Sequence, residues 1–329
     1  MPYRRMLLTA ALSSLVAAHA SLVEAQGTKF SLPAGTTGLY PTAPNASGDV
    51  AGTYLTSGRE YSHSYGFLRL ADGTFTTIDV KRSFRHNTSV EAIDDNDTVV
   101  GQYEDENNPD IDHAFVRTAD GTLTRFDAPD AYDTFPSDVN AGAGEIVGWY
   151  YAADGNHGFV RKKDGKLATI DDPGASGGTY PYAVNSSGNI TGRYVDSGGV
   201  DHGFLRNSDG TWQTIDPPGS VYTDNVVIND KGVISGIYQD GGNGMLYGFV
   251  LDHGTYYPYT DYFSRLNAHR HAVGQTFRLA FRDGNFTTKP VAPPKRCSNL
   301  FLTGINDAGL FSGSMQCGNG RWFGWLASK

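Results

Sequence analysis

Several features that mark other protein classes are scarce in this sequence. Charged residues make up only 19% of the 329 residues, which excludes a coiled coil and a charge-rich disordered chain. The formal net charge of -9, with no basic stripe to offset it, excludes a nucleic-acid partner. No segment has a sustained apolar period of 3.6 residues, so we expect helices to be nearly absent. Only two cysteines occur, too few to hold a metal ion by themselves.

Familiar catalytic and metal-binding motifs are also missing. The chain has no G-x-S-x-G, no H-E-x-x-H and no P-loop. His269 and His271 would place two imidazoles on one side of a strand, but no carboxylate lies near them in sequence, which favours a surface turn. The acidic segment 104–112 lacks the glycine and the spacing of a calcium loop, which favours a solvated bulge. We therefore predict no metal and no cofactor.

The N-terminus resembles a secretory signal peptide. Arg4 and Arg5 precede an apolar stretch of small residues over 6–18, and cleavage sites follow Ala20 and Ala25. The stretch is too short for a stable membrane span, although an uncleaved anchor is the alternative. We predict a signal peptide over residues 1–25, a single domain over residues 26–329, and a secreted or secretory-pathway protein without membrane attachment after cleavage.

Six N-x-S/T sequons make N-linked glycosylation a further hypothesis for an exported chain. Two of them lie in a turn motif that favours asparagine and serine for structural reasons, so the motif alone does not decide the matter. The candidate sites are Asn45, Asn87, Asn96, Asn185, Asn189 and Asn285.

Glycine and aromatic residues are abundant, and they recur in a unit that appears seven times. Each unit has a turn followed by apolar-Gly-x-Tyr, as in NSSGNITGRY from Asn185. A His/Tyr-Gly-Phe triplet follows, and then Asp-Gly with a short alternating run ending in Ile-Asp, as in DGTWQTID from Asp209. Four strand-length runs separated by hairpin signals are typical of a propeller blade. The sequence predicts an all-β, seven-bladed β-propeller of four-stranded blades, with an open solenoid of the same units as the alternative.

The last unit predicts how the ring closes. It lacks its DG…ID strand, whereas the segment GTKFSLPAG from Gly27 matches that strand. The N-terminal strand is therefore expected to complete the last blade and remove its free edge. Cys297 and Cys317 are symmetric about the turn of this blade, so they should lie opposite each other on two antiparallel strands. We predict a structural disulfide between them.

The repeat resembles the extracellular family named for its His-Ala-Phe signature. His113-Ala114-Phe115 is that triplet, and the glycine form recurs as His157-Gly158-Phe159 and His202-Gly203-Phe204. The resemblance covers nearly all of residues 27–329 and implies a propeller, but it does not define an activity.

Residues that recur in every unit are expected to build the fold. The three triplet histidines should be packing residues between blades. The aspartates that end the Ile-Asp runs should cap the turns that follow them. These are Asp79, Asp127, Asp171 and Asp216.

The functional site is expected on the face that carries the long, variable loops, at the mouth of the central channel. Residues there that depart from the repeat are the candidates. The proposed catalytic members are Arg82, Arg85, His86, Asp224, Tyr262 and Arg265. The proposed substrate-pocket members are Glu91, Tyr132, Phe135, Tyr180, Tyr182, Tyr222, Asn225, Phe263 and Phe301.

Three functions fit such a site. An exported propeller of this size and repeat is similar to the hetero-Diels–Alderases of tropolone–sesquiterpene biosynthesis, which implies a metal-free pocket acting on a small organic substrate by cycloaddition. A polysaccharide lyase or hydrolase is the second, with His86 as base beside Arg82 and Arg85. A non-catalytic carbohydrate- or protein-binding module is the third. Mouth loops that differ from unit to unit favour one asymmetric site over a multivalent binder.

Overall fold

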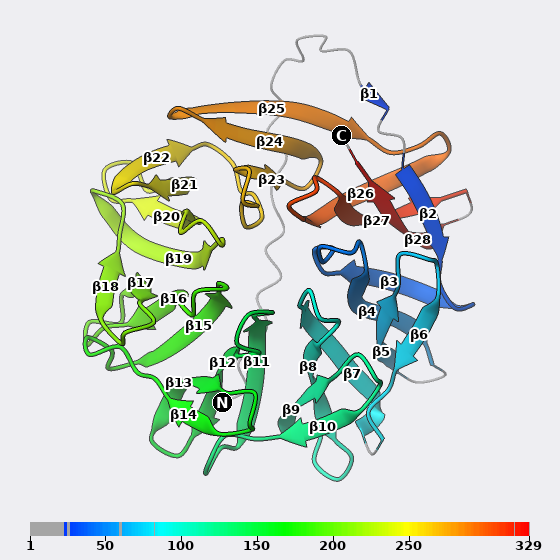
Figure 1. Ribbon diagram of the computed structural model, residues 1–329, viewed down its shortest axis with the longest axis horizontal. Helices are drawn as coiled ribbons and strands as arrows, with labels where there is room; N and C mark the ends of the chain where they lie inside the picture. The colour runs from blue at the N-terminus through cyan, green and yellow to red at the C-terminus, as the bar shows by residue number, and fades with distance from the viewer. Residues whose placement is uncertain (1–22, 25–26, 59–60, 82, 319, 329) are drawn as a thin grey trace.

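The computed structural model describes residues 23–24, 27–58, 61–81, 83–318 and 320–328. Within these ranges the chain forms strands and no helix, and the strands are arranged in sheets around a central axis (Figure 1). The fold is an all-β propeller with four-stranded blades. No helix that could cross a membrane is found in the part of the chain that the structure describes.

The fourth repeat shows how the sequence makes a blade. Its strands pair antiparallel in sequence order, and each corresponds to one of the four predicted runs. The first turn needs a glycine because Gly188 has a φ of 78° and its amide donates to the carbonyl of Asn185. The strands are β15 (Gly178–Val184), β16 (Ile190–Val195), β17 (Asp201–Arg206) and β18 (Trp212–Ile215).

The third and fifth repeats form sheets of the same order. The third consists of β11 (Asp133–Val139), β12 (Ile146–Ala152), β13 (Gly155–Arg161) and β14 (Leu167–Thr169). The fifth consists of β19 (Ser220–Ile228), β20 (Ile234–Asp240), β21 (Leu246–Asp252) and β22 (Thr255–Tyr259).

The first two repeats share one eight-stranded sheet, so the described chain has five separate four-stranded sheets instead of the seven predicted. A single parallel pair, Ser64 with Asn87, joins β5 to β7, because the long strand β7 starts beside β5 before it reaches the axis. The strands are β3 (Thr36–Pro41), β4 (Val50–Ser57), β5 (Ser62–Arg69), β6 (Phe75–Ile78), β7 (Ser83–Ile93), β8 (Val99–Asp105), β9 (Asp112–Arg117) and β10 (Leu123–Phe126).

The closing sheet confirms the predicted pairing of the N-terminal strand. Strand β2 (Gly27–Ser31) lies antiparallel to β28 (Arg321–Ala327), next to β27 (Phe311–Cys317) and β26 (Cys297–Ile305). Cys297 and Cys317 are directly opposed in the β26–β27 pair and form a disulfide, as predicted. Disulfides persist in oxidising compartments, so this bond agrees with an exported protein.

The sixth repeat has only three strands of its own: β23 (His271–Val273), β24 (Phe277–Arg282) and β25 (Asn285–Ala292). A short strand, β1 (Val23–Glu24), adds to β25 in parallel and becomes the fourth. This strand lies inside the predicted signal segment, whose other residues lie outside the described residues.

The repeated aromatics form the core between the sheets. Phe67, Phe115, Phe159, Phe204, Phe249, Phe281 and Trp325 are all fully buried. The glycine of apolar-Gly-x-Tyr lies beneath such a ring: a Cβ on Gly148 would come within 2.1 Å of the carbonyl of Phe135 and 2.8 Å of the Phe159 ring. The repeat marks therefore record packing requirements.

Seven turn residues, one from each repeat, surround the axis and are called here the turn ring. They are Asn45, Asp94, Asn140, Asn185, Asn229, Asn267 and Asn306. Each of the six asparagines donates its Nδ2 to the backbone carbonyl of the next member, for example Asn185 to Asn229 at 3.2 Å and Asn306 to Asn45 at 2.7 Å. These bonds connect neighbouring repeats around the axis.

Two of the predicted glycosylation sites are wrong for the folded chain because they belong to this ring. Asn45 and Asn185 are only 4% and 3% exposed, and their side-chain amides are hydrogen-bonded. The other sequons stay predictions: Asn285 is exposed in the β24–β25 turn, and Asn87, Asn96 and Asn189 also lie outside the core.

Candidate functional site

A cavity of about 600 Å³ lies on the axis. Its wall takes residues from seven segments, within 42–46, 91–95, 137–141, 182–186, 225–230, 263–268 and 303–307. Each segment includes the first turn of a repeat, and five of them also include the end of an innermost strand, namely β7, β11, β15, β19 and β26. The cavity therefore extends to the end of the channel that carries the short turns, called here the short-turn end.

The prediction placed the pocket at the opposite, long-loop end. Five of the predicted residues do line the cavity, namely Glu91, Tyr182, Asn225, Phe263 and Arg265. Arg85, His86, Asp224 and Tyr262 do not, and neither do Tyr132, Phe135, Tyr180, Tyr222 and Phe301. Arg82 lies outside the described residues. The structure thus separates the predicted set into a cavity group and a long-loop group.

Side-chain size changes along the innermost run of each repeat. Five residues before the turn-ring member, five of the seven repeats carry an aromatic residue, and we call these residues the aromatic collar. Two residues before that member, four repeats carry alanine or glycine, and these residues pack closely: a Cβ on Gly304 would come within 2.4 Å of the Cβ of Ala43. The collar consists of Tyr40, Phe135, Tyr180, Tyr262 and Phe301.

The cavity wall is strongly acidic. Six carboxylates line it, and among the described lining residues Arg265 is the only cation. Arg265 Nη1 donates to Asp138 Oδ2 at 2.8 Å, and this carboxylate also accepts from the amide of Val184. The Arg265 side chain is 41% exposed within this open cavity, and the charge of Asp138 raises the pKa of its guanidinium. Arg265, predicted as a cation for a ligand carbonyl, is therefore already paired within the protein.

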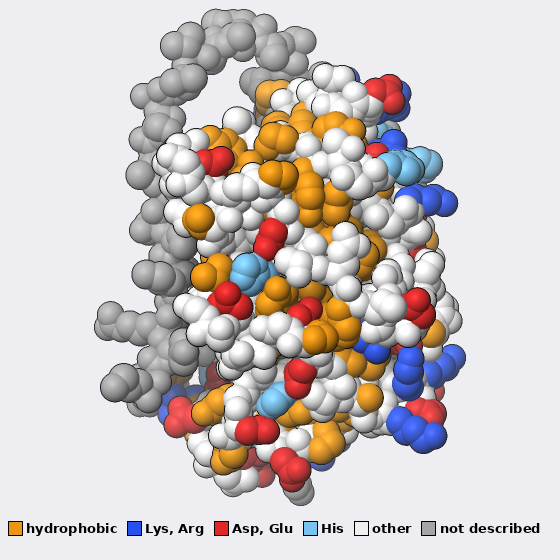
Figure 2. Space-filling view, turned by 90° about the vertical axis from the view of Figure 1, so that its left-hand side faces the viewer, with side chains coloured by type: hydrophobic (Ala, Val, Ile, Leu, Met, Phe, Trp, Pro, Cys, Tyr) orange, Lys and Arg blue, Asp and Glu red, His pale blue; other side chains and the backbone are white. Residues whose placement is uncertain are grey.

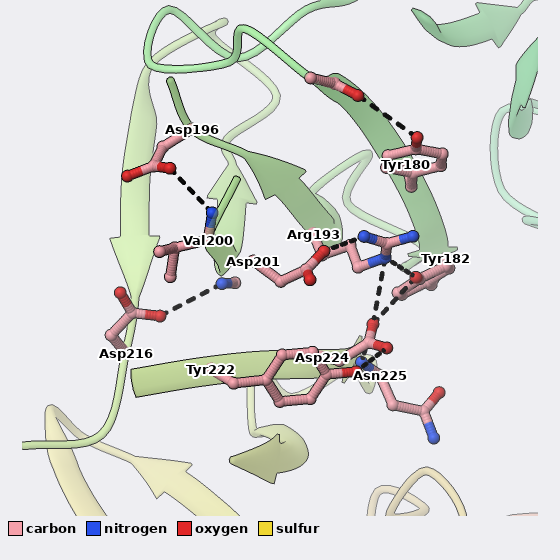
Figure 3. A network of polar contacts seen from close by, with 12 residues as sticks. Tyr180, Tyr182, Arg193, Asp196, Val200, Asp201, Asp216, Tyr222, Asp224 and Asn225 are labelled. Atoms are coloured by element: carbon pink, nitrogen blue, oxygen red, sulfur yellow. Dashed lines mark hydrogen bonds and ion pairs between the residues drawn. The ribbon is translucent and has the colours of Figure 1, made fainter. Parts of the chain in front are cut away.

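Between the fourth and fifth repeats, Asp224 accepts hydrogen bonds from two tyrosine hydroxyls (Figure 3). Its Oδ1 accepts from Tyr182 Oη at 2.9 Å, and its Oδ2 accepts from Tyr222 Oη at 2.7 Å. Arg193 on β16 donates its Nε to Tyr182 Oη at 2.7 Å and pairs with Asp201. The structure brings together residues that are 42 positions apart in sequence.

These phenols act as hydrogen-bond donors. Burial, followed by the charge of Asp224, raises the pKa of Tyr182 well above its usual value and raises that of Tyr222 as well. Burial by itself would lower the pKa of Arg193, but Tyr182 and Asp224 outweigh it and raise that pKa. At neutral pH neither tyrosine is therefore suited to be a general base.

Sequence reasoning missed Arg193, because it sits inside a repeated motif. It occupies the variable position of apolar-Gly-x-Tyr, where other repeats have Thr53, Gln102 or Trp149. Trp149, at this position in the third repeat, stacks on Phe135 with ring centroids 4.2 Å apart. The signal that would have found Arg193 is this variable position between a glycine and a tyrosine that most repeats share.

Backbone geometry also marks Asn225. It has a φ of 55°, in the left-handed region, next to a bulge in β19, and its amide donates to Asp224 Oδ1 at 2.6 Å. The Asn225 side chain points away from the tyrosine pair and lines the cavity (Figure 3). Asp224 therefore accepts hydrogen bonds from both tyrosine hydroxyls and from the backbone amide of Asn225.

The triplet histidines pair with the Ile-Asp aspartates, which corrects the predicted capping role of those aspartates. Nδ1 of His113, His157 and His202 donates to Asp127, Asp171 and Asp216, at 3.0, 2.8 and 2.6 Å respectively. Their Nε2 atoms face a second aspartate each. Each imidazole also packs on the tyrosine of its own repeat. These histidines are part of the fold, as expected.

His86 departs from this pattern. The first repeat has Tyr65 in the histidine position, so Asp79 instead accepts from Nδ1 of His86 at 2.8 Å, and His86 stacks on Tyr65. The His86 side chain is 55% exposed, against 21–25% for the three triplet histidines. No hydrogen bond to a described residue involves its Nε2. Asp79 thus orients the His86 imidazole through Nδ1, while Nε2 is open to a ligand.

Arg85 lies beside it on the same segment. Its guanidinium is 3.5 Å from the centroid of the Tyr61 ring, and its carbonyl accepts from His63 Nδ1 at 2.6 Å. Arg85 and His86 have φ values of 49° and 56°. Two consecutive non-glycine residues in the left-handed region are uncommon, and such strain is often found at functional sites.

The remaining candidates take simpler positions. Tyr132 packs against Tyr151 and is exposed, as are Tyr262 and Phe301. His269 is exposed whereas His271 is buried, so the two do not share one surface. In the acidic segment, Asp105 Oδ1 accepts from the amides of Asn107 and Asn108 and stabilises a turn. No cluster of metal-ligating side chains is found within the described ranges.

The outer wall gives no further site of this kind on the face shown in Figure 2. Lys and Arg side chains gather at the right-hand edge of that view instead of crossing the wall, and Asp and Glu are spread over the rest. The features that depart from the repeat are therefore the cavity, the Asp224 group and the segment of Arg85 and His86.

No protein-family model and no curated protein matches the chain. Solved structures do. Virginiamycin B lyase from Staphylococcus aureus, solved as a catalytically inactive variant with quinupristin, has a TM-score of 0.59 at 15% identity, over 93% of this chain and 100% of that one. Polysaccharide lyase Uly1 has a TM-score of 0.56 at 12% identity, over 94% of each chain. Pyrococcus horikoshii acylaminoacyl peptidase has a TM-score of 0.58 at 9% identity, over 90% of this chain and 52% of that one. The fold is thus one shared with propeller enzymes, including lyases.

Proposed function

We propose that the protein is a lyase-like propeller enzyme in which His86 is the general base of an elimination reaction. The observation that carries this proposal is the state of the imidazole: Asp79 holds Nδ1, while Nε2 is open and the ring is exposed. A carboxylate on Nδ1 fixes the tautomer whose Nε2 accepts a proton, and it stabilises the imidazolium that forms. The presence of two lyases among the similar structures supports the reaction class.

The reaction needs a base and a cation close together. In an elimination, Nε2 of His86 takes the proton from the carbon next to a carboxyl group, the C–H electron pair forms a C=C bond, and the C–O bond of the leaving group breaks. Negative charge develops on the carboxyl oxygens in the transition state, where a guanidinium can stabilise it. Arg85 supplies that guanidinium from the adjacent position. A uronate-containing polysaccharide is the substrate class that best matches this chemistry.

The test is turnover of uronate polymers, measured as new ultraviolet absorbance from the unsaturated product. Polygalacturonate and alginate serve as probes, and quinupristin, the compound in the similar lyase structure, is the third probe. His86→Gln should lower kcat/KM by about 10²–10⁴-fold. The matched control is His157→Gln, which removes a partly buried triplet histidine and should leave kcat/KM within a few fold of wild type at a temperature where both variants are folded.

Two outcomes would contradict the proposal. In the first, His86→Gln keeps the wild-type rate while the enzyme is active. In the second, none of the probes yields an unsaturated product. Binding of a glycan with several equivalents per chain and no turnover would favour the non-catalytic module.

The cycloaddition hypothesis is the second candidate, and the cavity favours it. About 600 Å³ is the volume of a small-molecule site, and Tyr182, Asn225 and Arg265 bring polar groups to its wall. Conversion of a hydroxyl-bearing diene precursor, followed by mass spectrometry of the cyclised product, tests it. Loss of that activity in Asn225→Ala but not in His86→Gln would place the reaction in the cavity.

We also infer that the eight-stranded sheet acts as two blades, which gives seven in the ring. One residue pair joins its halves, and seven segments and seven turn-ring residues surround the cavity. Membership of the His-Ala-Phe repeat family follows from the same repeats and is likewise proposed.

A further inference from the structure

The turn ring is interrupted at one place. Six asparagines donate to the carbonyl of the next member, but the bond from the second repeat to Asn140 is missing, because a carboxylate has no proton to donate there. Asp94 is only 4% exposed. Its Oδ1 accepts from the amides of Asn96 and Thr98, whereas its Oδ2 is buried without a hydrogen-bond partner among the described residues.

A buried acceptor without a donor is costly, so this position favours either a proton on Asp94 or a donor from outside the chain. By the symmetry of the ring, Oδ2 of Asp94 takes the place from which an asparagine would reach the carbonyl of Asn140. Two acceptors then share one gap, and Asp94 and Asn140 both line the cavity.

The surroundings favour a positively charged donor. Asp97 Oδ1 accepts from Asn45 Nδ2 at 2.9 Å, and burial together with the nearby Asp49 raises the pKa of Asp97. The buried Arg69 lies within electrostatic range of Asp49, but its Nη1 donates to the carbonyl of Leu70. Along the cavity wall six carboxylates face one guanidinium, which Asp138 already neutralises. Anions are repelled from such a space, and cations are attracted to it.

We propose that the cavity binds a linear aliphatic amine, with one primary ammonium group at the gap between Asp94 and Asn140. An ammonium group carries three donors and a compact positive charge, which match two acceptors in an acidic pocket. The cavity is large enough for an alkyl chain, and the carboxylates of Asp95, Asp230 and Asp307 provide places for a second amine. This ligand site is separate from His86 and does not depend on the elimination chemistry.

The experiment is isothermal titration of the folded protein with hexamethylenediamine at constant ionic strength. Hexanediol, which has the same chain without charge, is the matched ligand control, and potassium chloride controls for inorganic cations. The diamine should bind, and the other two should give no saturable heat.

Three variants locate the site. Asp94→Asn supplies the missing amide donor, so it should weaken diamine binding by about tenfold or more and raise Tm. Asp94→Ala removes the acceptor without adding a donor and should weaken binding to a similar degree. Asp230→Asn removes a charge from the same wall but keeps the oxygen that accepts from Ser186, so it should weaken binding by only about two- to threefold.

The results that would overturn the proposal are distinct. Equal losses in Asp94→Asn and Asp230→Asn would mean that only the overall charge matters. Equal binding of hexanediol would mean an apolar site, and the same response to potassium would mean an inorganic cation. No heat with the diamine would mean that no amine binds and that water or a proton on Asp94 supplies the missing donor. The Tm of Asp94→Asn shows whether the carbonyl of Asn140 is within reach, independently of any activity at His86.

Discussion

The two ends of the channel differ in how far their residues recur from repeat to repeat. At the short-turn end nearly every repeat contributes the same asparagine, and the side-chain amides connect the repeats in a ring. At the long-loop end the same strands carry different residues, such as Tyr180, Asp224 and Phe301 at one equivalent position. The residues that recur from repeat to repeat support the fold. At each end, one residue differs from its counterparts in the other repeats and becomes a candidate for function: Asp94 in the turn ring and His86 beside the long loops.

The comparison predicts its largest effect for a repeated core residue. Phe159 is fully buried between two sheets, so Phe159→Ala should lower the free energy of unfolding by about 3–5 kcal/mol. The matched variant Phe135→Ala truncates a half-buried collar residue and should cost less than about 2 kcal/mol, because water can fill the space. Urea unfolding of both measures the difference. Equal losses would show that the long-loop end is as tightly packed as the core.

The closing sheet provides the next effect. Replacing both Cys297 and Cys317 by serine removes a covalent link across 20 residues and should lower the free energy of unfolding by about 3 kcal/mol. Non-reduced peptide mass spectrometry should show the linked pair in wild type. Reductant should then destabilise wild type and leave the double variant unchanged. A double variant as stable as wild type would mean that strand β2 alone fastens the ring.

The smallest effect concerns the triplet histidines and pH. Burial lowers the pKa of His157, but its hydrogen bonds and charge pairing with Asp171 and Asp154 outweigh burial and raise that pKa above the unfolded value. The charged imidazole of His157 therefore contributes its full stabilisation of the fold below the unfolded pKa of about 6.5. This contribution is lost as pH rises through the pKa of the folded state. The stability difference between wild type and His157→Gln should shrink by about 0.5 kcal/mol from about pH 5.5 to about pH 8.5.

Urea unfolding at the two pH values measures this change. A difference that grows with pH would mean that the neutral imidazole is the form that the fold prefers. His202→Gln offers a repeat of the test, because the pKa of His202 is raised in the same way by Asp216 and Asp196 against its burial.

Local patterns predicted the scaffold well. The buried ring of Phe159, the glycine beneath it and the opposed cysteines all follow from spacing, because strand pairing converts sequence distance into position. The strand from Gly27 was predictable for the same reason, since it supplies the one run that the last repeat lacks.

The candidate site was predictable only in part. Exceptions to the repeat pointed to His86, Arg265 and Asp224, but not to their partners. That Arg265 is neutralised by Asp138 depends on two repeats meeting across the axis, 127 residues apart. That Asn45 and Asn185 cannot carry a glycan depends on the ring, which is invisible in a three-residue motif.

By itself the sequence determined the all-β class, the four-stranded unit, the closing strand and the disulfide, because each rests on neighbours within one repeat or on a missing run. Only the tertiary structure decided at which end the cavity lies, which histidine has an open nitrogen, and that Asp94 leaves the ring one donor short. Those properties arise from contacts between repeats around an axis. Their energies depend on distances between groups that the order of residues along the chain does not specify.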